Sequence, residues 1–239
     1  MTVQQMLAMC SGLWLAYTAG ATILLLVGGA LLTGTRAMWL VAQASAEVAR
    51  LRTVEAPARI LRLATDLSIG PLVCVEGASP VAFCVGGLRP SVYVSEGLGA
   101  LDDAELEAVL MHEQDHLRQR EPLRRAVRRA ATWGFFYVPL LRWWARYQAE
   151  RSELRADRLA LSRVSPQVLA RALLRSDWAA PSLRAATAFA GAAEARVAQI
   201  LGDPLPTRRP GLRLWALSVA GIATALWATH CAGGMLIFV

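Results

Sequence analysis

The chain has 239 residues, 55% of them hydrophobic, and a formal net charge of +7 in which every Lys or Arg position is arginine. So basic a chain could bind nucleic acid, but its arginines are not interleaved with exposed aromatic residues in any recognisable module, so we expect no nucleic-acid partner. Attraction to anionic lipid accounts for the same excess of positive charge. Nothing in the composition indicates an oligomeric state.

Both ends of the chain are uncharged, because all Asp, Glu and Arg residues lie between Arg36 and Arg213. Each end is apolar over the roughly 20 residues that a helix needs to cross a bilayer. Residues 1–35 therefore predict an N-terminal transmembrane helix, and residues 212–239 predict a C-terminal one. The start lacks the basic n-region of a cleaved signal peptide, which favours a permanent anchor. For the second segment, which His230 interrupts, the alternative is a buried core helix.

The arginines that flank the two predicted spans all lie on the side of the central segment. Positive charge favours the cytoplasmic side of a membrane. We therefore expect a multi-pass protein of the plasma membrane with a cytoplasmic domain over residues 36–211. Cys74 and Cys84 would then be reduced thiols, since disulfides are rare in the cytosol.

The first half of the central segment contains a predicted helix and three predicted strands. Apolar residues recur at helical spacing over 39–63, with Pro57 as a candidate break. Short β-branched or aromatic runs separated by Gly and Pro then predict strands over 71–76, 81–85 and 91–94.

The next predicted helix, over 103–120, has a clear start signal. Asp102 is a suitable N-cap, and Glu105 three residues later completes a capping-box pattern. An apolar stripe of leucine and valine follows at helical spacing.

Two of the three histidines lie in this helix, four residues apart, in the motif H-E-x-x-H. His112 and His116 share one helix face, so both imidazoles can reach one metal ion. Glu113 is then beside the water that such an ion polarises. The alternative is an exposed, charged helix face whose histidines bind nothing.

A later helix, predicted over 148–161, places Glu153 and Asp157 four residues apart on one face. A hydrolytic zinc ion takes three protein ligands and keeps one position open for water, and Glu153 is the natural third ligand. Asp157 can accept the N–H of a ligand histidine and fix its tautomer. We therefore expect one Zn²⁺ per chain. The alternative is an ordinary charged helix with Glu/Arg pairs.

Several segments around these motifs are less decisive. Pro122 suits the first turn of a helix whose clustered arginines form either a solvated face or a membrane-interface face. The uncharged stretch 130–141 is too short to span a membrane and either joins the core or enters the interface. Further helices are predicted from Ser165 and over 192–201, before a Pro-rich linker at 202–210.

A resemblance to a known family rests on three segments, residues 82–94, 106–118 and 153–160. Together they resemble the integral-membrane zinc metallopeptidases of the BlaR/MecR type, over roughly residues 71–201. The related heat-shock and CAAX-prenyl membrane proteases share both motifs but usually insert a membrane hairpin between them. The segment between the motifs is too short for such a hairpin here, which favours the BlaR/MecR type.

The resemblance implies a fold and a metal site. The fold is a mainly α membrane protein with a zincin-like α+β peptidase domain, a small antiparallel β-hairpin or sheet, and two flanking transmembrane helices. The implied zinc ligands are His112, His116 and Glu153, and the implied catalytic residue is Glu113.

The resemblance also implies that the hairpin offers an edge to an extended protein or peptide substrate. The candidate substrate-binding residues on it are Phe83, Cys84, Val85 and Tyr93. The expected function is that of a membrane-anchored zinc endopeptidase, which would cleave a cytoplasmic repressor or another regulatory protein. A quality-control protease of membrane proteins and a catalytically silent membrane scaffold are the alternatives.

Overall fold

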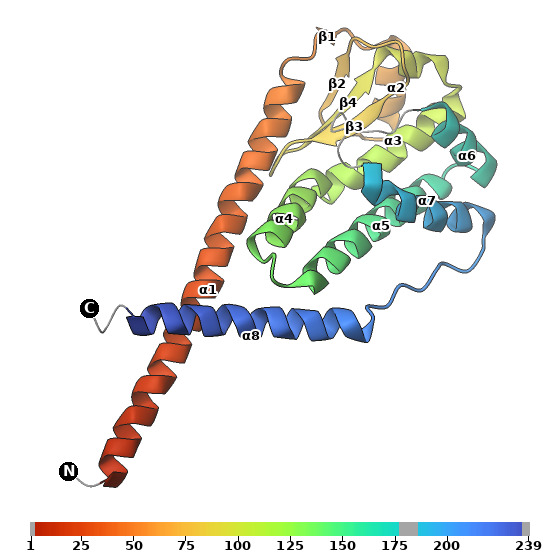
Figure 1. Cartoon of the computed structure of the whole chain (residues 1–239). Helices are drawn as coiled ribbons and strands as arrows, with labels where there is room; N and C mark the ends of the chain where they lie inside the picture. Colours follow the sequence, from red (N-terminus) through yellow and green to blue (C-terminus); the bar gives the residue numbers. More distant parts are fainter. Residues whose placement is uncertain (1–2, 177–185, 236–239) are drawn as a thin grey trace. The chain divides into compact units, whose positions relative to one another are not determined.

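The computed structural model describes residues 3–176 and 186–235 (Figure 1). In chain order the elements are α1 (Val3–Val48), β1 (Thr53–Val54), α2 (Ala58–Asp66), β2 (Leu72–Val75), β3 (Ala82–Val85), β4 (Ser91–Ser95), the 3-10 helix η1 (Glu96–Ala100), α3 (Asp103–Arg118), α4 (Glu121–Gly134), α5 (Pro139–Leu161), α6 (Pro166–Arg175), α7 (Ala186–Leu201) and α8 (Leu212–Met235). The expected mainly α fold with a small sheet is confirmed.

The chain divides into two compact units. The helical unit consists of Met1–Arg36, Val127–Ala145 and Arg209–Val239, and the sheet unit consists of Ala37–Ala126 and Arg146–Arg208. These units follow internal packing, so they do not test the domain boundaries at 35/36 and 211/212, which remain predictions.

Two helices are long and apolar enough to cross a membrane, as judged by length and composition. They are Ala16–Val48, within α1, and Leu212–Thr229, within α8. Only 6% of the most apolar 18-residue window of each is buried in the protein. A core helix of that hydrophobicity would be mostly buried, so the low burial disfavours the core-helix alternative for the second segment.

Within the helical unit, glycines allow close approach between helices. A Cβ on Gly29 of α1 would lie 2.5 Å from the Phe135 ring, and a Cβ on Gly221 of α8 would lie 1.9 Å from the carbonyl oxygen of Tyr137. Small residues at such positions are typical of helices that pack in membranes. The Leu140 N–H donates to the Ser218 hydroxyl at 2.9 Å and adds a polar contact to α8.

The predicted helix over 39–63 is wrong in its middle. The helix α1 ends at Val48, the chain then forms the short strand β1, and α2 begins after Pro57. The helical pattern is overridden because β1 pairs antiparallel with β2, which satisfies its backbone groups without a helix. Pro57 has φ −50° and ψ 135°, the extended conformation that ends one segment and starts the next helix.

The sheet has the strand order β1-β2-β4-β3. Strands β3 and β4 form the antiparallel hairpin that the sequence predicts, but β2 and β4 are parallel, so the sheet is mixed rather than antiparallel. The cause is the connection after β2, which carries the chain past the position of β4 before β3 begins. Ser95 holds this connection, since its hydroxyl donates to the Ser79 carbonyl at 2.6 Å and accepts from the Val81 N–H at 2.9 Å.

Helix α3 lies at the centre of the sheet unit, against β3 and β4 on one side and α6 on another (Figure 1). Its residues from Leu106 to His116 are all buried except Glu107. The core around it contains fully buried side chains such as Val92, Val94 and Leu110, each of which contributes about 1.5–3 kcal/mol by leaving water. The motif helix is therefore held from several sides.

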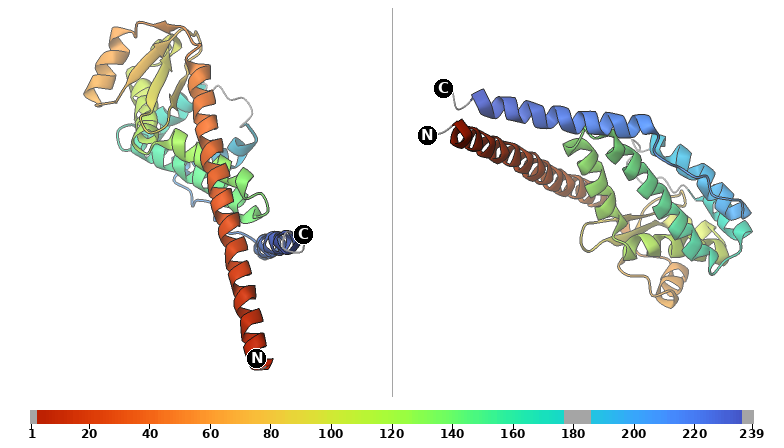
Figure 2. Two further views of the ribbon diagram at one scale, coloured as in Figure 1. Left: turned by 90° about the vertical axis from the view of Figure 1, so that its left-hand side faces the viewer. Right: turned by 90° about the horizontal axis from the view of Figure 1, so that it is seen from below.

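Helix α5 begins at Pro139, earlier than the predicted start at Gln148. Its second half runs alongside α3, with an ion pair between Arg155 and Asp115 at 2.9 Å (Figures 1 and 2). The uncharged stretch 130–141 forms the end of α4, a turn and the start of α5 in the helical unit.

Candidate metal centre and active site

The helix that carries the H-E-x-x-H motif starts with the predicted capping box. The Glu105 N–H donates to the Asp102 carboxylate at 2.8 Å, and the Asp102 N–H donates to the Glu105 carboxylate at 3.1 Å. Helix α3 then continues without interruption to Arg118, so His112 and His116 lie one turn apart on the same face.

The two histidine side chains meet at their Nε2 atoms, which are 3.0 Å apart. Both are buried, with 1% and 7% of their surface exposed. The ligand atoms of His112, Glu113 and His116 all lie within 4.8 Å of one another. The motif therefore does not lie on an exposed helix face.

Glu153 of α5 extends its carboxylate to both imidazoles. Its oxygens lie 3.5 Å from His112 Nε2 and 3.6 Å from His116 Nε2. Two atoms bound to one tetrahedral zinc ion at roughly 2.0–2.1 Å lie about 3.3 Å apart, which is close to the three separations found here. The two imidazoles and this carboxylate therefore fit a single zinc ion, with a fourth position left for water.

Asp157, one turn after Glu153, is fully buried and accepts a hydrogen bond from His112 Nδ1–H at 3.0 Å. This bond orients the ring and leaves Nε2 facing His116 and Glu153. Burial alone would raise the pKa of Asp157, but the hydrogen bonds from His112 and Arg196 lower it below its ordinary value. Asp157 is therefore an ionised acceptor.

Arg196 of α7 is a site residue that the sequence did not reveal. Its Nε donates to Asp157 Oδ2 at 2.6 Å and its Nη2 donates to Oδ1 at 2.7 Å, while Nη1 lies 3.6 Å from Glu153. Only 12% of its side chain is exposed. An arginine within the predicted amphipathic helix 192–201 is normally assigned to the solvated face, so only its contacts identify it.

Arg125 of α4 also contacts the site. Its Nη2 donates to Glu153 Oε1 at 3.2 Å, and 44% of its side chain is exposed. In the sequence it is one of several clustered arginines, and no spacing rule distinguishes it from its neighbours. Burial alone would raise the pKa of Glu153, but its interactions with His116, His112 and Arg125 hold that pKa well below the ordinary value.

The two histidines differ in their affinity for a proton. Burial lowers the pKa of His116 to about 4, so its imidazole is neutral at pH 7. Burial acts in the same direction on His112, but hydrogen bonds to Asp157 and Glu153 outweigh it and raise the pKa of His112 to about 9. A metal ion bound by His112 Nε2 would therefore have to displace a proton, which makes binding dependent on pH.

Glu113 points into the same buried region. Burial raises the pKa of its carboxyl, and its Oε2 has no hydrogen-bond partner within the described part of the chain. A buried carboxylate oxygen without a partner is costly and is typical of a functional site. It is suited to accept a proton from a water molecule nearby.

The four candidate substrate-binding residues do not all face the site. Cys84 does, since its thiol donates to the Glu113 carbonyl at 3.3 Å. Phe83 and Tyr93 stack on each other at 5.6 Å, and strand alternation places them on the opposite face of the sheet from Cys84. Val85, at the end of β3, is half-buried. In the described chain β3 pairs only with β4, so it is an edge strand.

Burial raises the pKa of the Cys84 thiol, so it is neutral rather than a nucleophile. Neither Cys74 nor Cys84 forms a disulfide.

Comparison with known proteins agrees with this geometry. A family model described as Peptidase family M48 matches residues 51–230, which include both ligand helices and α7. A search of curated proteins found no match to the chain. The match does not distinguish subtypes, so the finer resemblance to the BlaR/MecR type remains a prediction. The chain belongs to peptidase family M48, whose members are generally metal-dependent.

Proposed function

We propose that the protein is a membrane-anchored, zinc-dependent endopeptidase. The observation that carries this proposal is the set of three separations among His112 Nε2, His116 Nε2 and the Glu153 carboxylate, which are 3.0, 3.5 and 3.6 Å. Family membership supports peptide-bond hydrolysis, and the donor set of two imidazoles and one carboxylate is one that zinc peptidases use.

In this proposal His112, His116 and Glu153 hold the ion. Zinc held there would supply Lewis-acid chemistry, lowering the pKa of a water molecule toward neutrality and polarising the scissile carbonyl. Glu113 would accept a proton from water at Oε2 and return it to the leaving amine. Its position next to the ligands, with Oε2 unpaired among the described residues, suits both transfers.

Asp157 and Arg196 act on the ligands rather than on the substrate. The Asp157 carboxylate fixes the tautomer of His112, and Arg196 fixes that carboxylate through two hydrogen bonds. Such partners of metal ligands change metal affinity or activity by 10–100-fold when they are removed.

The substrate would bind as an extended strand along β3. Main-chain pairing at a sheet edge supplies affinity with little dependence on side chains. Cys84 lies between this edge and Glu113, so residue 84 would face the bound peptide close to the scissile bond. Phe83 and Tyr93 would support the strand from its far face.

The partners in this proposal are a protein or peptide substrate and the lipid bilayer. The two apolar helices support anchoring in the plasma membrane, and the flanking arginines support a cytoplasmic position of the peptidase part. A regulatory protein such as a repressor is one class of substrate, and membrane proteins in need of removal are the other.

The test uses the full chain purified in detergent. Wild type should contain close to one zinc ion per chain and cleave casein, whereas Glu113→Gln should keep the zinc and lose cleavage by roughly 10²–10⁴-fold. A catalytically silent scaffold would give equal, zinc-independent results for both proteins. Comparison of cellular peptides between wild type and Glu113→Gln would then identify the substrate class.

A further inference from the structure

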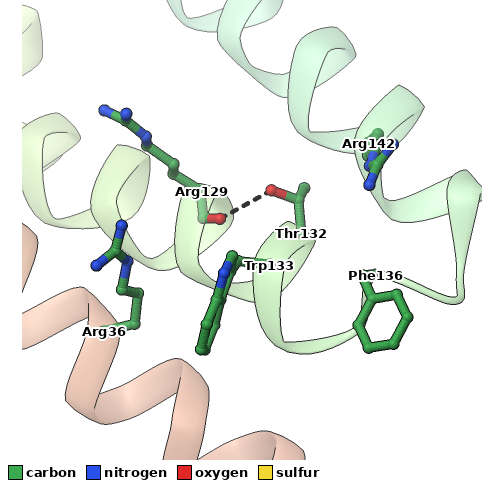
Figure 3. A pocket seen from close by; sticks show the side chains of 6 residues that line it. All are labelled: Arg36, Arg129, Thr132, Trp133, Phe136 and Arg142. Carbon is green, nitrogen blue, oxygen red and sulfur yellow. Dashed lines mark hydrogen bonds between the residues drawn. The ribbon is translucent and has the colours of Figure 1, made fainter.

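A pocket of about 330 Å³ lies within the helical unit, and none of the candidate metal ligands lines it. It is formed by side chains of α1, α4 and α5 and by the turn after α4 (Figure 3). The residues that line it are Arg36, Arg129, Thr132, Trp133, Phe136 and Arg142. Three arginines from three helices around one hollow indicate a site for an anion.

The charge of the helical unit is entirely positive. Its three segments contain six arginines and no aspartate or glutamate, so they hold most of the net charge of the chain. Among the residues that the structure describes, no acid pairs with Arg129 or Arg142. Within the described part of the chain, the charges of Arg129 and Arg142 are therefore not neutralised by a carboxylate.

The pocket arginines also mark the boundaries of uncharged segments. Arg36 is the first charged residue after the apolar start of the chain, and Arg129 and Arg142 flank the uncharged stretch 130–141. Basic residues at the ends of apolar segments lie at the depth of lipid headgroups when the segments enter a bilayer. All three would thus reach the same layer.

Two aromatic side chains complete the pocket. Trp133 is 54% exposed and Phe136 is 67% exposed, so both rings offer apolar surface beside the arginines. The Arg36 guanidinium lies over the Trp133 ring at 5.7 Å. Tryptophan next to a cationic group is typical of membrane interfaces, where one end of the site is apolar and the other polar.

We propose that this pocket binds the phosphate headgroup of an anionic glycerophospholipid, with the acyl chains against Trp133 and Phe136. Arginine recognises phosphate through paired hydrogen bonds. A zwitterionic choline headgroup would bring a further positive charge next to the three arginines. A free phosphate has no acyl chains to pack against the aromatic side chains. The proposal rests on the membrane anchoring proposed above, but not on peptidase activity.

The test is lipid retention by the full chain in neutral detergent, measured by native mass spectrometry. Wild type should retain phosphatidylglycerol in preference to phosphatidylcholine. The double variant Arg129→Gln/Arg142→Gln should retain about 25-fold less phosphatidylglycerol, since each arginine near an anionic headgroup contributes roughly a factor of five. Thermal unfolding of each variant checks that it is folded.

The matched control is Arg209→Gln/Arg213→Gln, which removes the same charge from exposed positions of the same unit outside the pocket. It should retain phosphatidylglycerol within about twofold of wild type. Equal loss in both double variants would overturn the proposal, because bulk charge would then explain retention. If the pocket variant fails to fold, the comparison of lipids on wild type is the test. Equal retention of phosphatidylglycerol and phosphatidylcholine by wild type would then overturn the proposal.

Two further measurements distinguish a lipid phosphate from a free phosphate and separate the lipid proposal from the peptidase proposal. Millimolar inorganic phosphate should not displace phosphatidylglycerol, and displacement would make a soluble anion the ligand instead. Glu113→Gln should retain the lipid like wild type, so a failure of the peptidase proposal leaves this result unchanged. Carbonate extraction of cell membranes tests the anchoring itself.

Discussion

Arg196 donates two hydrogen bonds to the carboxylate of Asp157, at 2.6 and 2.7 Å, and Oδ1 of the same carboxylate also accepts the Nδ1–H of His112 at 3.0 Å. A helix from the last quarter of the described chain thus holds the orientation of His112, a candidate metal ligand on α3. Asp157 is fully buried and only 12% of the Arg196 side chain is exposed, so water weakens the contact little.

Replacement of Arg196 by Gln should therefore weaken zinc binding and activity by about 10–100-fold. The reason is that Asp157 loses both hydrogen bonds and no longer fixes the His112 ring. Zinc affinity by competition with a chelator and kcat/KM on a peptide substrate measure the effect. Arg163→Gln, an exposed arginine that follows α5, is the control and should change neither quantity. Unchanged zinc affinity in Arg196→Gln would contradict the assigned role.

Replacement of Glu153 by Gln should remove most of the bound metal. An amide is a poor ligand for zinc, and it would leave only two histidines to hold the ion. We expect the zinc content to fall well below one per chain and hydrolysis to be lost with it. In wild type, a chelator should abolish cleavage and added Zn²⁺ should restore it.

Glu107→Gln is the matched control for this variant, since it changes a half-buried glutamate on the side of α3 away from the ligands. Its zinc content should equal that of wild type. If Glu153→Gln retains a full equivalent of zinc, the ligand set is wrong.

The stability of the sheet unit should depend on pH through Glu105. Burial alone would raise its pKa, but the hydrogen bonds from the Asp102 N–H and from Arg175 lower it below the ordinary value of 4.5. A lowered folded-state pKa means that the stabilisation is present above about pH 4.5 and is lost as the pH falls through the folded-state value. Glu105→Gln should thus lower the free energy of unfolding by about 1–2 kcal/mol at pH 7, a figure that allows for solvent screening of the half-exposed Arg175.

Thermal unfolding of wild type and Glu105→Gln, measured from pH 7 to pH 3, checks this sign. The difference between the two midpoints should be largest at pH 7 and shrink below pH 4.5. A difference that grows toward low pH would contradict the ionised capping box.

Packing around the motif helix should be sensitive to loss of volume. Leu110 of α3 is fully buried in the core, so Leu110→Ala should lower the free energy of unfolding by about 2–5 kcal/mol. Leu174 of α6 is 87% exposed, and Leu174→Ala should change stability by less than about 0.5 kcal/mol. Equal effects of the two variants in chemical denaturation would argue against the placement of α3.

Alanine at Gly221 should lower the thermal unfolding midpoint, whereas alanine at Gly28 should not lower it. A Cβ at Gly221 would lie 1.9 Å from the Tyr137 carbonyl oxygen, whereas a Cβ at Gly28 meets nothing within 4 Å. Gly221→Ala should lower the thermal midpoint because backbone must move. Gly28→Ala should leave it unchanged or raise it, since alanine favours a helix over glycine by about 1 kcal/mol. A raised midpoint for Gly221→Ala would mean that α8 does not pack there.

Local signals explain what could be predicted from the sequence. The capping box at Asp102, the spacing of His112 and His116 and the position of Glu153 each depend on residues a few positions apart, and the structure brings the three candidate ligands together. Strands β2 to β4 were visible as short β-branched runs. Their order was not, because pairing depends on the path of the connection between β2 and β3.

The remaining features depend on contacts between distant segments. Arg196 is 39 positions from Asp157, and nothing in the local pattern of α7 distinguishes it from an ordinary surface arginine. Arg125 is similar, one of four arginines near the start of α4. The end of α1 at Val48 was missed because an alanine-rich pattern continues past it, while β1 is selected by its partner strand.

Arg196 comes late in the chain, after the other four groups of the proposed centre. A growing or proteolytically shortened chain that stops before α7 already contains both histidines and both carboxylates. On the proposed function, it would still lack the guanidinium that aligns His112, so it would bind its metal about 10–100-fold more weakly than a chain that includes α7.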